Sequence, residues 1–221
     1  MTHTSPTGKD DAAEQAPIVY VVDDDESMRT SLRNLLRSVG LRVELFASAG
    51  EFLDFEMPDT PSCLVLDVRL KGQSGLAFQT ELANTDIELP IIFMTAHGDI
   101  AMSVRAMKAG ALDFLAKPFR DQDMLDAIDH AIEHDRQRRK ASRGLGELRA
   151  KYQTLTLRER QIMSYVIAGL LNKQIAADVF LSEITVKIHR AQAMKKMEAA
   201  SVADLVRKAE ALGIEPATPR R

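Results

Sequence analysis

Cysteine and tryptophan are almost absent from this 221-residue sequence, in which Cys63 is the single cysteine and no tryptophan occurs. One cysteine excludes an internal disulfide and a zinc site built from several cysteines. The sequence also lacks an apolar run of 18 residues, which a membrane-spanning helix would need, and residues 1–17 lack the apolar segment of a secretory signal. We therefore expect a cytoplasmic protein that does not bind membranes and that begins with a disordered tail over residues 1–16.

Charge is distributed unevenly along the chain, although the net charge is only −3. Residues 1–135 hold 11 Lys and Arg against 24 Asp and Glu, residues 136–151 hold 7 against 1, and residues 152–221 hold 11 against 7. An acidic front and a basic back indicate two domains with different partners. The basic end is the one suited to nucleic acid.

The front of the chain alternates short β-branched runs with helical patterns. The spacing predicts strands at 18–22, 41–46, 63–66, 90–94 and 111–115, and helices at 27–39, 49–55, 75–83, 100–109 and from about Asp121 onward. Five strands that alternate with helices predict an α/β fold, a five-stranded doubly wound parallel sheet. Such a sheet places functional groups at the carboxyl ends of its strands.

The back of the chain reads as a small all-α domain of four helices. Residues 134–144 carry no apolar face, and Gly144 and Gly146 favour breaks, so we expect a charged, partly helical linker over residues 136–152. Thr156 and Glu159 form a capping-box pattern, Asn172 suits the N-cap of a helix over 173–179, and further helices are expected at 183–197 and 202–211. The short connection between the second and third of these helices predicts a helix-turn-helix. Residues 214–221 are expected to form a disordered tail.

Polar side chains follow four of the predicted strands. The first strand ends in Asp23, Asp24 and Asp25, the third in Asp67, the fourth in Thr95, and Lys117 follows the fifth. Any one of these residues alone would be explained by a strand ending, but together they converge on one edge of a parallel sheet. Clustered carboxylates favour a bound cation, and oxygen ligands favour Mg²⁺. A lysine, a hydroxyl and Mg²⁺ suit an incoming phosphoryl group, for which an aspartate can be the nucleophile.

The motifs VVDDDE, LVLDVR and MTAHGD, with Phe114-x-x-Lys117-Pro118-Phe119, resemble a response-regulator receiver domain. The resemblance covers residues 17–135 and implies the flavodoxin-like fold, and MTAHGDI is specifically similar to the FixJ subgroup. It implies that Asp67 accepts a phosphoryl group from a phosphohistidine of a sensor histidine kinase. It also implies that Thr95 and Lys117 hold the phosphoryl oxygens.

The same resemblance implies the ligands of a Mg²⁺ cofactor and the parts of a switch. Mg²⁺ would be held by Asp24, Asp67 and the backbone carbonyl of Arg69, with Asp23 acting through a water molecule. Thr95 and Phe114 would be the switch residues, and the bond between Lys117 and Pro118 would be cis, which proline permits. One departure concerns Lys71, which stands where many receivers have proline, so the lifetime of the phosphoryl group is left open.

Residues 153–213 resemble a DNA-binding domain of the LuxR/NarL type, most sharply in NK-x-IA and TVK-x-HR. A turn of about 100° per residue places Val186, His189, Ala193 and Met197 on the core face of the third helix. Ile184, Lys187, Ile188, Ala191 and Lys195 fall on the opposite face, which would enter the major groove.

Candidate DNA contacts divide into base contacts and phosphate contacts. Lys187 can donate to guanine and Ile188 can touch a thymine methyl group, whereas Lys173, Arg190 and Lys195 suit phosphates. Ser182 and Thr185 complete the predicted interface, although Thr185 suits local capping equally well. The aromatic residues Tyr152, Tyr165 and Phe180 are interpreted as core residues.

These features predict a phosphorylation-switched transcription regulator that binds promoter DNA and works with RNA polymerase. A signalling adaptor whose C-terminal helices bind protein is the alternative, and the basic helix face argues against it. An aspartyl-phosphate phosphatase is disfavoured because Asp67 is followed by Val68 and Arg69 instead of the DxD pattern. The stimulus, the kinase, the promoter and the sign of regulation remain open.

Phosphorylation is expected to produce a homodimer. When Thr95 moves toward the phosphoryl group, Phe114 can fill the space it leaves, which changes the nearby surface. That surface offers a mixed apolar and basic face close to Asp121, Asp123 and Asp126, and a self-complementary patch of this kind suits a two-fold dimer. The residues predicted for this dimer face are Met102, Arg105, Ala106 and Lys108.

Overall fold

The computed structural model describes residues 16–96 and 100–218 and divides the chain into two compact units, Met1–Arg139 and Lys140–Arg221. Apart from Ala16, the predicted N-terminal tail lies outside the described residues, and so does His97–Asp99 of the MTAHGD motif. No described helix has the length and apolar character to span a membrane.

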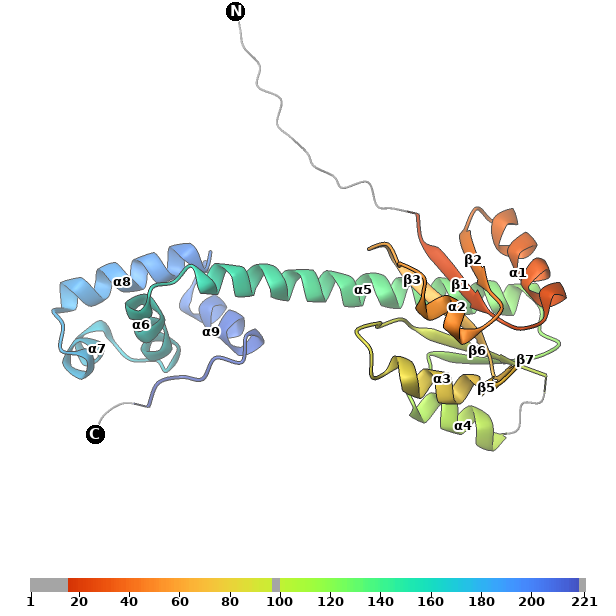
Figure 1. Ribbon diagram of the computed structural model, residues 1–221. Coiled ribbons are helices and arrows are strands. Elements are labelled where there is room, and N and C mark those ends of the chain that lie inside the picture. Colours follow the sequence, from red (N-terminus) through yellow and green to blue (C-terminus); the bar gives the residue numbers. More distant parts are fainter. Residues whose placement is uncertain (1–15, 97–99, 219–221) are drawn as a thin grey trace, which may run out of the picture. The chain divides into compact units, whose positions relative to one another are not determined.

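The first unit is built from alternating strands and helices (Figure 1). Its elements are β1 (Ile18–Val22), α1 (Glu26–Ser38), β2 (Arg42–Phe46), α2 (Ala49–Leu53), β3 (Ser62–Asp67), β4 (Arg69–Leu70), β5 (Gln73–Ser74), α3 (Gly75–Leu82), β6 (Ile91–Thr95), α4 (Ile100–Lys108), β7 (Asp113–Ala116) and the first part of α5 (Asp121–Gln153).

Five of these strands form one parallel sheet in the order β2-β1-β3-β6-β7. All five residues of β1 and all six of β3 are buried, because both faces of the sheet are covered, and β3 is apolar from Cys63 to Leu66. Helices α1 and α5 pack on one face, through residues such as Leu36 and Ile128, while α2, α3 and α4 pack on the other, through Phe52, Phe78 and Ala106. The predicted doubly wound sheet is therefore confirmed.

A short hairpin of β4 and β5 follows β3 and was not predicted. It turns at Lys71 and Gly72, and Gly72 has φ +85°, a conformation that suits glycine. Gly75 then approaches the end of β3 closely, since a Cβ there would lie 2.3 Å from the Asp67 carbonyl oxygen. The hairpin and Gly75 together fix the backbone around Asp67.

Helix α5 is longer and more regular than the sequence predicts. It continues through Gly144 and Gly146 to Gln153, so the expectation of a partly helical segment interrupted by these glycines is wrong. Its charged stretch is also not wholly solvated. Asp135 is fully buried and accepts hydrogen bonds from the Ser62 backbone N–H (2.9 Å), from Arg138 (2.8 and 3.0 Å) and from Arg139 (2.6 Å).

The second unit is helical, as predicted, and holds the rest of α5 with α6 (Leu157–Ile167), α7 (Asn172–Val179), α8 (Glu183–Lys196) and α9 (Val202–Ala211). The capping box of Thr156 and Glu159 is present. The N-cap predicted at Asn172 is wrong, because α7 already includes Asn172 and its Leu171 N–H donates to the Gln174 side chain at 2.8 Å. The oxygen of the Asn172 side chain instead accepts from Arg190 at 2.9 Å.

Two further expectations in this unit are corrected. Phe180 is not a core residue but 82% exposed, and it adopts a left-handed conformation with φ +55° at the end of α7. The residues directly after α9 are not a free tail. Ile214 and Ala217 pack against the helical core, and the Ala217 N–H donates to the Ser164 carbonyl at 2.9 Å. The last three residues, 219–221, lie outside the described part of the chain.

Candidate functional site

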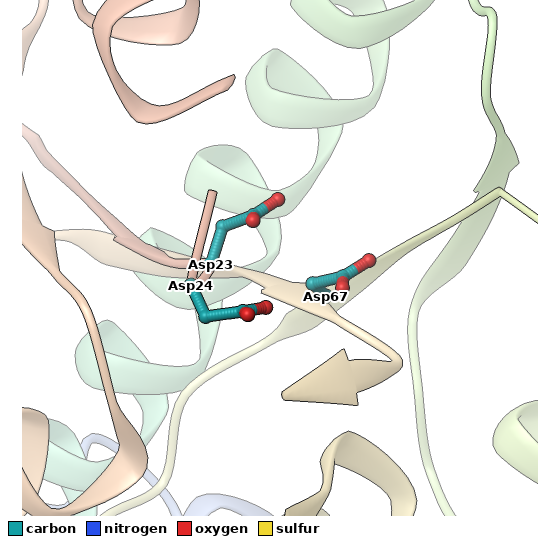
Figure 2. Close-up of side chains that lie close together, drawn as sticks. All are labelled: Asp23, Asp24 and Asp67. Carbon is teal, nitrogen blue, oxygen red and sulfur yellow. The ribbon is translucent and has the colours of Figure 1, made fainter. Parts of the chain in front are cut away.

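Three carboxylates meet at the carboxyl edge of the sheet. Asp23 and Asp24 follow β1, and Asp67 ends β3, the strand paired with β1. One ligand oxygen from each lies within 4.8 Å of the others, and Figure 2 shows the three side chains gathered at the strand ends. Asp25 is not part of this group, because its side chain caps α1 by accepting from the Ser27 N–H at 2.8 Å.

Lys117 reaches this cluster from the end of β7. Its Nζ lies 2.8 Å from Asp23 Oδ2 and 3.1 Å from Asp67 Oδ1. A cis bond precedes Pro118, and the Lys117 backbone N–H donates to the Thr95 carbonyl at 2.7 Å. Burial alone would lower the Lys117 pKa, but the hydrogen bonds and charges of Asp23 and Asp67 outweigh it and raise that pKa. The lysine is therefore held as a cation.

Burial dominates the electrostatics of Asp67. It raises the pKa of the carboxyl group, while Lys117 and the Arg69 backbone N–H, 3.3 Å from Oδ2, act in the opposite direction and Asp23 adds to the increase. A carboxylate that is costly to keep charged gains from an additional cation. The donor set consists of hard oxygens, which is the chemistry that Mg²⁺ prefers. The three aspartates therefore fit a Mg²⁺ site.

Asp24 is the most accessible of the three carboxylates and has a lysine partner of its own. Its side chain is 22% exposed, and Lys71 Nζ lies 3.3 Å from its Oδ2. Sequence reasoning noted Lys71 only as a replacement for proline. The pairing was missed because it needs the β4–β5 hairpin, which turns the loop back toward β1.

Thr95 and Phe114 occupy neighbouring strands beside the cluster. Thr95 ends β6 and is buried, and β6 pairs with β3 so that Met94 lies opposite Asp67. Phe114 lies on β7 opposite Phe93, with 6.4 Å between the two ring centres, and is half-buried. The structure therefore brings Asp23, Asp24, Asp67 and Lys117 together, with Thr95 and Phe114 on the next two strands, β6 and β7.

The predicted dimer face is only partly on the surface. Arg105 and Lys108 are exposed on α4, and Met102 is half-buried against the core. Ala106 is completely buried between α4 and the sheet, so its assignment to the face is wrong. Exposed apolar side chains of α4 are instead Val104 and Met107.

Helix α8 presents the two faces that the sequence predicts. Val186, Ala193 and Met197 are buried in the helical core, and His189 is half-buried. The opposite side is exposed and consists of Ile184, Lys187, Ile188, Ala191 and Lys195. Lys173 is exposed on α7. The helix thus offers a basic and apolar surface that its own core does not use.

The remaining residues predicted to bind DNA also make internal contacts. Ser182 caps α8 by accepting from the Thr185 N–H at 3.1 Å, and the two hydroxyl oxygens lie 2.8 Å apart. Arg190 donates through one guanidinium nitrogen to Asn172, which ties α8 to α7. These contacts set the geometry of the exposed face, and they leave the other donors of Arg190 available to a partner.

Family comparisons match the two units separately. Residues 19–129 match the model described as response regulator receiver domain, and residues 153–209 match the model described as bacterial regulatory proteins, luxR family. Nodulation protein W of Bradyrhizobium diazoefficiens is 60% identical over 197 residues, which cover 89% of this chain and 87% of that protein. Transcriptional regulatory protein FixJ of Rhizobium meliloti is 43% identical over 198 residues, 90% of this chain and 97% of that protein.

Solved structures of response regulators are also similar to this chain over most of its length. The response regulator StyR, solved at low resolution, superposes with a TM-score of 0.79 at 48% identity and covers 88% of this chain and 98% of its own. Full-length FixJ from B. japonicum superposes with a TM-score of 0.53 at 40% identity, with 89% and 97% covered. Each similarity spans both units.

Proposed function

The chain belongs to the response regulators of two-component systems that carry a LuxR-type DNA-binding domain, and from that premise we propose that Asp67 is its phosphoryl acceptor. The chain is a phosphorylation-dependent transcription regulator and not a metabolic enzyme, which confirms the function predicted from its motifs. A receiver domain implies a sensor kinase as partner, and a LuxR-type domain implies DNA as the other partner.

The proposed reaction transfers a phosphoryl group from a phosphohistidine of the kinase. An Asp67 carboxylate oxygen attacks phosphorus, the bond between phosphorus and the imidazole nitrogen breaks, and that nitrogen keeps the electron pair. Lys117, 3.1 Å from Asp67, is placed to move onto a phosphoryl oxygen. The Thr95 hydroxyl donates to another phosphoryl oxygen.

We assign the Mg²⁺ cofactor to the same pocket. Asp24, Asp67 and the Arg69 backbone carbonyl would hold the ion, with Asp23 acting through water, and the ion would supply positive charge to the phosphoryl oxygens. The observation that supports this assignment best is the approach of three carboxylates within 4.8 Å, beside a lysine that touches two of them.

Replacing the acceptor gives the direct test. Asp67→Asn should abolish labelling by radioactive acetyl phosphate with Mg²⁺, because an amide is not a nucleophile for phosphorus. Asp54→Asn changes an exposed aspartate on the same unit and should label like the wild type. Undiminished labelling of Asp67→Asn would move the acceptor to another residue.

We further propose that phosphorylation is read out by Thr95 and Phe114 and leads to a homodimer. The dimer would use the α4–β7–α5 side of the receiver, with Met102, Arg105 and Lys108 near Asp121, Asp123 and Asp126. Ala106 has no place in this face. Phe114→Ala should still accept phosphate yet stay monomeric, as measured by light scattering at tens of micromolar. A phosphorylated wild type that is monomeric but binds DNA tightly would contradict the dimer mechanism.

The DNA-binding part of the proposal rests on the exposed face of α8 and its neighbours. Lys187 and Ile188 would contact bases, and the remaining residues would contact phosphates, namely Lys173, Ser182, Thr185, Arg190 and Lys195. We assign residues 17–135 to the receiver, 136–152 to the linker and 153–213 to the DNA-binding domain. We further propose that the protein regulates promoters in the cytoplasm, with RNA polymerase as a further partner.

A further inference from the structure

Helix α8 exposes two large β-branched side chains that its fold does not need. Ile184 is 74% exposed and Ile188 is 56% exposed, and a spacing of four residues places both on the same face. The core of this unit is filled from the opposite side of the helix by Val186, Ala193 and Met197. Both isoleucines are therefore available to a partner.

Ile184 is held firmly in this position. Ser182 caps the first turn of α8, and its hydroxyl contacts both the backbone and the hydroxyl of Thr185. A β-branched side chain in a helix strongly prefers one χ1 rotamer. Ile184 therefore cannot fold back onto the core, and the surface it offers is fixed before any partner binds.

The surroundings of the two isoleucines are basic. Lys187 lies on the same face, Lys195 extends it by two turns, and Lys173 is exposed on α7, while Glu183 is the acidic residue at the start of α8. An apolar stripe flanked by cations matches a major groove flanked by phosphates. The apolar group that this groove offers is the thymine methyl. The side chain of isoleucine cannot form hydrogen bonds, so it adds to the binding free energy only where it contacts such a group.

We propose that Ile184 reads a thymine methyl group, as a second apolar reader beside Ile188. Four residues of helix span about 6 Å, which corresponds to roughly two base-pair steps of about 3.4 Å. The binding site is thus expected to hold two thymines, on either strand, about two steps apart. This inference rests on the proposed groove-facing side of α8 and adds a residue that determines specificity.

Single removal of thymine methyl groups tests the inference. A duplex is first enriched from a random pool with the full-length phosphorylated protein, and each thymine is then replaced by uracil, which removes only the methyl group. Affinity is measured by fluorescence anisotropy. Loss of one buried methyl contact should weaken binding by the wild type about four-fold at each of two positions.

Alanine variants show which isoleucine contacts which methyl group. Ile184→Ala should become insensitive to uracil at one of the two positions, and Ile188→Ala at the other. Leu157→Ala, which removes an 84% exposed leucine of α6, should keep both sensitivities. Thermal unfolding of each variant should match that of the wild type, because neither isoleucine is part of the core.

Several outcomes would overturn the inference, and they differ in scope. If no duplex is enriched, the proposed DNA contacts fail together with it. An enriched duplex without a uracil-sensitive thymine overturns the thymine contacts of both Ile184 and Ile188 and leaves the other proposed DNA contacts in place. A duplex with one sensitive thymine, whose sensitivity only Ile188→Ala removes, overturns the role of Ile184 alone. If Ile184→Ala binds as tightly as the wild type and is still weakened by uracil at both positions, Ile184 does not contact a thymine. The exposed isoleucine would then be available to a protein partner.

Discussion

The buried carboxylates of the first unit and the exposed lysines of the second differ in what their charges contact. In the receiver, three carboxylates are buried beside cations: Lys117 lies between Asp23 and Asp67, and Asp135 accepts from two arginines. In the DNA-binding unit, Lys173, Lys187 and Lys195 are exposed and form no ion pair with the described residues.

This difference separates charges that shape the fold from charges that serve a partner. Removing one member of a buried pair leaves an uncompensated charge, which costs several kcal/mol. An exposed lysine without a partner contributes little to stability, so its removal affects binding instead. Substitutions of the buried receiver charges should therefore lower stability, whereas substitutions of the exposed lysines should change DNA binding and leave stability nearly unchanged.

The largest effect is expected on the buried side. Asp135→Ala removes the acceptor of Ser62, Arg138 and Arg139 at once and should destabilise the receiver by about 3 kcal/mol. Glu88→Ala removes a 72% exposed partner of Arg138 and should cost less than about 0.5 kcal/mol. Urea unfolding followed by circular dichroism measures both. Equal stabilities for the two variants would show that burial does not separate them.

On the exposed side, two lysines should differ in how they affect DNA binding. Lys187→Ala should lose about 1–3 kcal/mol of discrimination between bases. Lys173→Ala should instead weaken binding to all sequences alike and reduce the salt slope by about one. Titrations with the selected duplex and with random duplex at several salt concentrations provide the measurement. The same profile for both variants would mean that the proposed orientation of α8 is wrong.

A smaller effect, of opposite sign, is expected at Phe180. Its left-handed backbone costs about 1 kcal/mol in a residue with a side chain, and the exposed ring has little packing to lose. Phe180→Gly should raise the free energy of unfolding by about 0.5–1 kcal/mol. Phe180→Ala removes the ring but keeps Cβ and should gain nothing. A loss of stability in the glycine variant would show that the ring has a packing role.

Sequence patterns predicted the parts of the structure that depend on local periodicity. The alternation of strands and helices predicted the parallel sheet. The residues at the ends of its strands predicted that Asp23, Asp67 and Thr95 lie at one edge of that sheet. The 3.6-residue period of α8 correctly separated Val186 from Lys187. These features depend on which side chains of one element are buried, and the spacing of apolar residues along that element shows this directly.

Features that depend on distant or irregular contacts were not predictable in the same way. Asp135 and Ser62 lie 73 residues apart in the sequence, so nothing near Asp135 indicates that its carboxylate is buried. The hairpin that brings Lys71 to Asp24 has only two residues in each strand, too few for a pattern. The prediction that Phe180 is a core residue was wrong because it relied on the general tendency of aromatic side chains to be buried.

The glycines inside α5 have a consequence for how this helix opens. A Cβ at Gly144 or Gly146 would meet nothing within 4 Å, so no close contact requires glycine there. Each glycine makes the helix about 1 kcal/mol less favourable than alanine would. Together they should make local opening of this turn about 30-fold more frequent than in an alanine-containing helix. Amide protons near these glycines should exchange with solvent first, and limited proteolysis should cut there before it reaches either folded core.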